Sequence, residues 1–149
     1  MATTVGTEDN IRDLVRNLIL LERDAIAAYE STIERLSDAN LSQQVEAFRQ
    51  DHLQHLGVLQ DIAAETGAEA PREGDMKQLL TTGKIALADL FGDGVILKAM
   101  ATNENDTVMA YERAAAHPDA IEKSRAFFQK ALSDEQRHRD WMHRTAEGL

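Results

Sequence analysis

Six ionisable residues stand at core-facing positions of otherwise apolar helical patterns. They are three glutamates and three histidines, namely Glu22, His52, His55, Glu104, Glu135 and His138. A buried charge without a partner is costly, so such a group loses its charge, pairs with another group or binds a cation. One such residue would be unremarkable, but six favour a metal site. A charge network in a purely structural polar core is the alternative.

The ligand types limit the metals and the kinds of chemistry. Imidazole and carboxylate groups without thiolate suit iron, manganese or zinc. The chain has no cysteine, which excludes disulfides, thiolate catalysis and iron–sulfur clusters. Its formal net charge of −10 disfavours nucleic acid and anionic lipid as partners. Because the first ten residues have neither a basic flank nor an apolar run, we expect no signal peptide and a cytoplasmic protein.

The elements that carry these residues are expected to be helices. Of the 149 residues 43% are hydrophobic and only 5% aromatic, which argues for aliphatic helix packing in a single domain over residues 1–149. Apolar residues recur at helical spacing. This spacing predicts long helices over 8–38, 41–66, 94–116 and 118–147 and a shorter one over 76–90.

Capping residues and breaks support these bounds. Thr7 is the expected N-cap of the first helix, and Gly67 ends the second. Asp75 and Gln78 have the spacing of a capping box for the short helix. Pro118 would stand in the first turn of the last helix.

The connections predict the topology. Short turns join the first pair and the last pair of long helices, so each pair is an antiparallel hairpin. The long stretch from 67 to 93 suits a crossover between the two hairpins. At about 1.5 Å of rise per residue, the six ionisable residues lie within one or two helical turns of a common layer. We therefore expect an all-α four-helix bundle with these residues in its core.

The chain also contains an internal repeat. LERDAIAAYES at 21–31 matches NENDTVMAYER at 103–113, and DHLQH at 51–55 matches DEQRH at 134–138 more weakly. Glu22 and Tyr29 of the first copy thus correspond to Glu104 and Tyr111 of the second. A repeated hairpin gives a bundle with a pseudo-twofold axis, which is a natural frame for a pair of metals.

With these motifs the chain resembles the ferritin-like superfamily, in particular bacterioferritin and rubrerythrin. Members carry one glutamate on each of two helices and a Glu-x-x-His motif on each of the other two. Glu22 and Glu104 match the single glutamates, and Glu135–His138 matches one motif. Tyr29 and Tyr111 resemble the family tyrosines that hydrogen-bond the site carboxylates.

The second helix departs from the family pattern. His52 stands where a glutamate is usual, as in a group of small ferritin-like domain proteins with a D-H-x-x-H second helix. Asp51 is an alternative ligand, but helical geometry turns it about 100° away from His52. We favour Asp51 and Asp134 as groups that each fix a histidine on the opposing helix pair. The alternative for both is a solvated surface aspartate.

The resemblance implies a function. It implies two metal ions, iron foremost with manganese or zinc as alternatives, that react with oxygen or peroxide while Fe(II) is oxidised. Tyr29 and Tyr111 would orient the carboxylates. Because no further helix is predicted after the fourth long one, we expect a homodimer and not a cage. The competing hypothesis is a non-enzymatic metal-binding or stress-linked helical bundle.

Overall fold

Four long helices dominate the computed structural model, which describes residues 3–72, 87 and 89–149. They are α1 (Ile11–Arg35), α2 (Ala39–Thr66), α4 (Asp93–Ala115) and α5 (Glu122–Glu147). Most of the short helix expected over 76–90, with its Asp75–Gln78 capping box, lies outside the described residues. No described helix is both long enough and apolar enough to cross a membrane.

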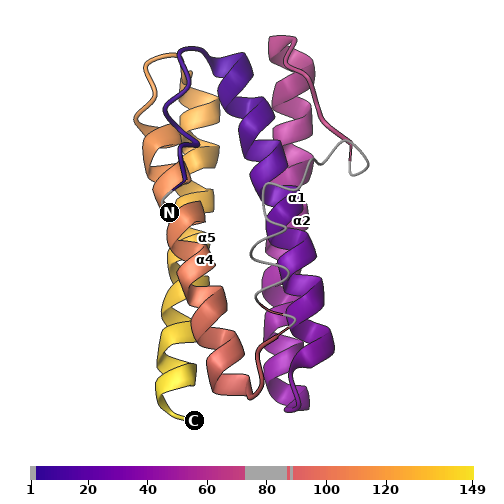
Figure 1. Cartoon of the computed structure of the whole chain (residues 1–149). Helices are drawn as coiled ribbons and strands as arrows, with labels where there is room; N and C mark the ends of the chain where they lie inside the picture. Colours follow the sequence, from indigo (N-terminus) through magenta and orange to yellow (C-terminus); the bar gives the residue numbers. More distant parts are fainter. Residues whose placement is uncertain (1–2, 73–86, 88) are drawn as a thin grey trace.

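The helices form two antiparallel hairpins that pack side by side (Figure 1). Each hairpin, α1–α2 and α4–α5, is held by extensive contact, and α1 also packs against α4 and α2 against α5. Because α2 and α4 run in the same direction, the end of α2 and the start of α4 lie at opposite ends of the bundle (Figure 1). The predicted all-α bundle of two hairpins joined by a long crossover is confirmed.

Two predicted helix starts are wrong. The N-cap of α1 is Asn10, whose side chain accepts a hydrogen bond from the Asp13 N–H at 2.9 Å. The Thr7 hydroxyl instead donates to the carbonyl of Thr4 at 2.7 Å, so it caps nothing. α5 begins at Glu122 and not at Pro118, because hydrogen bonds to His117 hold the connection in turns. The end of α2 at Gly67, in a left-handed conformation with φ 74°, is as predicted.

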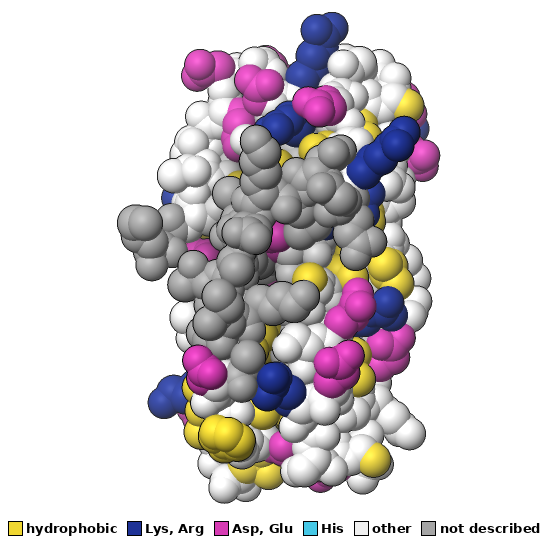
Figure 2. Space-filling view, turned by 45° about the vertical axis from the view of Figure 1, so that its right-hand side comes forward, with side chains coloured by type: hydrophobic (Ala, Val, Ile, Leu, Met, Phe, Trp, Pro, Cys, Tyr) yellow, Lys and Arg dark blue, Asp and Glu magenta, His cyan; other side chains and the backbone are white. Residues whose placement is uncertain are grey.

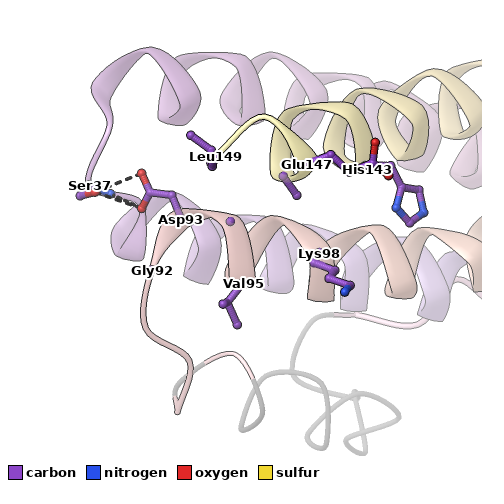
Figure 3. A pocket seen from close by; sticks show the side chains of 10 residues that line it. Ser37, Gly92, Asp93, Val95, Lys98, His143, Glu147 and Leu149 are labelled. Atoms are coloured by element: carbon purple, nitrogen blue, oxygen red, sulfur yellow. Dashed lines mark hydrogen bonds between the residues drawn. The ribbon is translucent and has the colours of Figure 1, made fainter.

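The start of α4 is tied to the turn of the other hairpin. No side chain caps α4 at its N-cap, Gly92. The next residue, Asp93, instead accepts hydrogen bonds at 2.9 to 3.1 Å from the backbone and hydroxyl of Ser37 (Figure 3). It also accepts one from the Asp38 N–H at 3.0 Å. These bonds lower the pKa of Asp93. They also fix the height of one hairpin against the other, and this height decides which residues meet in the core.

The described residues form two apolar core clusters. One contains Leu14, Leu18, Leu59, Tyr111 and Phe128, and the other Tyr29, Phe48, Leu97, Met100 and Met142, with further apolar neighbours in each. Along every helix the buried residues of one cluster precede the ionisable positions and those of the other follow them, except for Ile26 of the first cluster, which follows Glu22. A polar layer therefore crosses the middle of the bundle. Burial of each large apolar side chain contributes about 1.5–3 kcal/mol, which offsets the cost of this layer.

Candidate metal centre

The six ionisable residues come together in the polar layer, and each is at most 2% exposed. Glu22 lies on α1 and Glu104 on α4, while α2 and α5 each carry a pair of ligand types three residues apart. Residues at that spacing share one helix face. On the surface shown in Figure 2, acidic and basic side chains are interspersed, and no histidine is visible among the described residues.

The cluster contains two overlapping groups with the donors that a metal ion needs. One group is Glu22, His52, His55 and Glu135, and the other is His52, Glu104, Glu135 and His138. Within each group one nitrogen or oxygen atom per residue lies within 4.8 Å of the others. The two groups share His52 and Glu135, one from each hairpin. These buried residues could therefore hold metal ions.

The geometry distinguishes His52 from Asp51. His52 Nδ1 lies 2.7 Å from Glu22 Oε2, and its Nε2 lies 3.5 Å from oxygens of both Glu104 and Glu135. Its imidazole thus spans the cluster. Asp51 lies outside the two groups, with its carboxylate 2.8 Å from His138 Nε2. Of the two alternatives on α2, His52 is the residue that faces the cluster.

Asp51 and Asp134 form a crosswise pair of contacts between the hairpins. Asp51 on α2 accepts from His138 on α5, and Asp134 on α5 accepts from His55 on α2, both at 2.8 Å. Each contact uses the histidine Nε2, so in a neutral ring the proton lies there and Nδ1 faces the cluster with a free lone pair. Arg137 in turn contacts Asp51 at 2.8 Å and Asp134 at 3.4 Å.

The two tyrosines also bond across the hairpins. The Tyr29 hydroxyl on α1 donates to Glu104 on α4, and the Tyr111 hydroxyl on α4 donates to Glu22 on α1 at 2.5 Å. Burial and the neighbouring carboxylates raise the pKa of both phenols well above the ordinary value. They remain protonated donors, and each fixes one carboxylate oxygen.

Thr107 belongs to the cluster although the sequence did not single it out. Its hydroxyl lies 2.7 Å from Glu104 Oε2 and 3.0 Å from Glu135 Oε2. The hydroxyl has a single proton and therefore donates to one carboxylate at a time, but it lies within hydrogen-bond distance of both. Two signals could have identified it. It follows Glu104 by three residues, hence on the same face, and its counterpart in the repeat is Ala25.

The carboxyl groups of the metal-free cluster differ in protonation. Burial and the adjacent charge of Glu135 raise the pKa of Glu104 to about 7. Burial would also raise the pKa of Glu22, but the charges and hydrogen bonds of His52 and His55 hold it far below its ordinary value. Glu22 is therefore an anion, whereas Glu104 takes up a proton near neutral pH.

The histidines differ in the same way. Burial opposes the charged form of His52, yet Glu135 and Glu22 raise its pKa well above the ordinary value. Burial likewise opposes a charged His55, but hydrogen bonds to Asp134 and Glu22 and the nearby Glu135 carboxylate raise its pKa to about 11. For His138, burial outweighs the nearby carboxylates and lowers the pKa to about 4. In the metal-free cluster the positive charges of His52 and His55 thus lie among the carboxylates, where bound metal cations could lie instead.

Two atoms of the cluster lack hydrogen-bond partners. His52 Nε2 and Glu135 Oε1 are buried without one among the described residues. Buried polar atoms are nearly always satisfied, so such exceptions call for an explanation. Both atoms belong to the residues that the two groups share, where a bound cation would satisfy them. The donor set and these atoms fit a pair of metal ions.

A larger hollow of about 670 Å³ lies at the end of the bundle, away from this cluster (Figure 3). Asp93, Lys98, His143 and Leu149 are among its lining residues. None of the six cluster residues lines it. Its size therefore carries no argument about the chemistry of the buried centre.

Comparison with known proteins gives one family. A model of a domain of unknown function, DUF2383, matches residues 10–117, which include all of α1, α2 and α4. Four of the six cluster residues fall within the match, while Glu135 and His138 on α5 lie beyond it. No curated protein and no solved structure is similar enough to match. Since the matched segment is more than half of the chain, the protein belongs to the DUF2383 domain family.

Proposed function

We propose that the protein is a ferritin-like metalloprotein that binds two metal ions, iron foremost, and oxidises Fe(II) with oxygen or peroxide. One observation carries the proposal. Two four-residue groups overlap at His52 and Glu135, and one buried atom of each shared residue has no hydrogen-bond partner among the described residues. The resemblance of the glutamate and Glu-x-x-His spacing to ferritin-like proteins supports the same reading.

Each residue has a distinct task in this proposal. Glu22 and His55 would hold one ion, and Glu104 and His138 the other. His52 and Glu135 belong to both groups. The two oxygens of Glu135 could serve both ions, whereas a neutral His52 would bind one of them through its single lone-pair nitrogen. Metal ligands must be deprotonated, so loading displaces the protons that His52, His55 and Glu104 carry in the metal-free protein.

The surrounding residues prepare the ligands. Asp134 and Asp51 accept from Nε2 of His55 and His138 and thereby present Nδ1 to the metals. Tyr29, Tyr111 and Thr107 hold the carboxylates in place. When bound, a pair of redox-active ions supplies the electrons for reducing oxygen or peroxide. The protein itself excludes bulk water, because every ligand is at most 2% exposed.

Elemental analysis of protein purified without chelator tests metal binding. We expect about two metal ions per chain and a melting temperature that falls on chelation, because the ions bind only the folded state. Glu22→Gln should lose metal, whereas the matched change at exposed Glu30 of the same helix should not. Absence of metal, together with no metal-induced rise in melting temperature, would contradict the site.

Oxygen and peroxide consumption tests the reaction. Metal-free protein is loaded anaerobically with Fe(II) and mixed with either oxidant, with the Glu22→Gln and Glu30→Gln variants as controls. We expect consumption by the parent and by Glu30→Gln only. If the parent binds metal but consumes neither oxidant, the protein is the non-enzymatic metal-binding bundle of the competing hypothesis.

A further inference from the structure

A small cavity of about 20 Å³ lies between α1 and α4, beside the metal centre. Tyr29, Glu104 and Thr107 form part of its lining, and these side chains contact one another in the polar layer. One water molecule needs at least about 10–15 Å³ in the same measure. The cavity thus admits a molecule of one or two heavy atoms up to the carboxylate of Glu104, and it excludes a hydrated cation.

The walls of the cavity suit a neutral guest. Leu21, Ala25 and Ala28 line it from α1, and Met100 and Asn103 from α4. The described lining includes no lysine, arginine or histidine, so an anion finds no counter-charge there. Apart from Tyr29 its α1 side is apolar, and apart from Met100 its α4 side is polar. Leu21 and Ala25 correspond in the repeat to Asn103 and Thr107.

The cavity lies on the side of the centre opposite the histidines. On the α2–α5 side, Asp51, Asp134 and Arg137 form ion pairs over His55 and His138. On the α1–α4 side, the lining residues Asn103 and Asp106 are only half-buried, so solvent reaches that rim. A small molecule can therefore approach the centre between α1 and α4 without breaking an ion pair of the described lining residues.

From this geometry we propose that the α1–α4 cavity is the binding pocket and entry route for a neutral two-oxygen oxidant, dioxygen or hydrogen peroxide. Its role in catalysis rests on the proposed function, but the binding of a small neutral molecule does not. Ala25 and Ala28 keep the route open because they are small. Thr107 and Glu104 end it at the metal ligands.

Oxygen-induced NMR relaxation in the full-length, metal-free chain tests the pocket directly. Under oxygen pressure the methyl groups of Ala25, Ala28 and Met100 should relax several-fold faster than that of Val15, which is buried in the apolar core. Ala25→Leu should remove this excess by filling the cavity. Because overpacking costs about 1–3 kcal/mol, Ala25→Val provides a milder second variant. Ala110→Val, at the repeat counterpart of Ala28 and outside the lining, should keep the excess.

Two results would overturn the proposal: no excess over Val15 in the parent, or an unchanged excess in both Ala25 variants. In iron-loaded protein, Ala25→Val should slow the reaction with oxygen about tenfold and leave the bound metal unchanged. An unchanged rate would exclude the cavity as the route. A relaxation excess in a protein that binds no metal would uphold the pocket and refute the proposed function, so the two failures are distinguishable.

Discussion

Glu22 and Glu104 hold matching places in the two halves of the repeat, yet their surroundings shift their pKa values in opposite directions. Two histidines stabilise the anion of Glu22, while burial and Glu135 favour the protonated form of Glu104. A neutral amide resembles a protonated carboxyl group and not an anion. The two positions should therefore respond differently to the same substitution.

We expect Glu22→Gln to destabilise the metal-free protein at pH 6 by about 3 kcal/mol or more, because it leaves buried imidazolium charges unpaired. Glu104→Gln should cost no more than about 1 kcal/mol at that pH, where the native carboxyl is mostly protonated. Urea unfolding of both variants measures the difference. Equal losses, or a larger loss for Glu104→Gln, would show that the assigned protonation states are wrong.

The two aspartates should each control one metal position. Asp134 fixes His55 and Asp51 fixes His138, and loss of such a contact typically lowers metal affinity 10- to 100-fold. We expect Asp134→Asn and Asp51→Asn each to weaken one of two binding steps in a metal titration. Exposed Asp140 on α5 provides the control, Asp140→Asn, which should bind like the parent. If both steps weaken in both variants, the two positions do not have separate ligands.

At the level of the elements, the two hairpins are near copies that differ at the centre. His52 on α2 corresponds to Glu135 on α5, so in the proposed metal-bound site the residues shared by the two groups would be a neutral ligand and an anionic one. The three glutamates of this site would balance less of the charge of oxidised metals than the four glutamates of the usual ferritin-like pattern. The asymmetry therefore favours divalent ions or a higher reduction potential.

His52→Glu should restore the symmetry of the two hairpins. We expect faster aerobic oxidation of Fe(II) and a lower reduction potential, measured by stopped-flow absorbance and redox titration. His52→Leu should lose one metal ion and keep the fold, as checked by circular dichroism. If both variants load metal and oxidise iron like the parent, His52 is not a ligand.

The sequence allowed the helices and the six central positions to be predicted, since a charged residue in an apolar stripe is conspicuous. Thr107 was not predicted because threonine is ordinary in such a stripe, and its contact with Glu135 depends on how α4 meets α5. The N-cap prediction for α1 was wrong for a local reason. Thr7 and Asn10 are both followed by acidic residues, and sequence alone cannot decide which side chain reaches a free N–H. Similarly, Pro118 is compatible with a first helical turn but lies in the preceding connection.

For the whole molecule, the polar layer couples stability to pH. The pKa of His55 is about 11 in the folded metal-free protein against 6.5 as its ordinary value. Its contribution is thus complete below pH 6.5 and is lost as the pH rises towards 11. The slope is at most about 1.4 kcal/mol per pH unit for one group.

We therefore expect the free energy of unfolding of the metal-free protein to fall between pH 6.5 and pH 9. His55→Gln should flatten this decline, and His143→Gln, at an exposed position of α5, should not. Denaturant unfolding at several pH values measures the slopes. Equal slopes for the parent and His55→Gln would contradict the charged state assigned to His55.

The crosswise contacts have an evolutionary consequence. Tyr29 with Glu104, Tyr111 with Glu22, and each aspartate with its histidine all join one hairpin to the other. A single ancestral hairpin could make all of these bonds with a second copy of itself. Two identical copies, however, must change together, whereas halves fused into one gene can diverge. The differences between His52 and Glu135, and between Ala25 and Thr107, are changes that a dimer of identical hairpins could not carry.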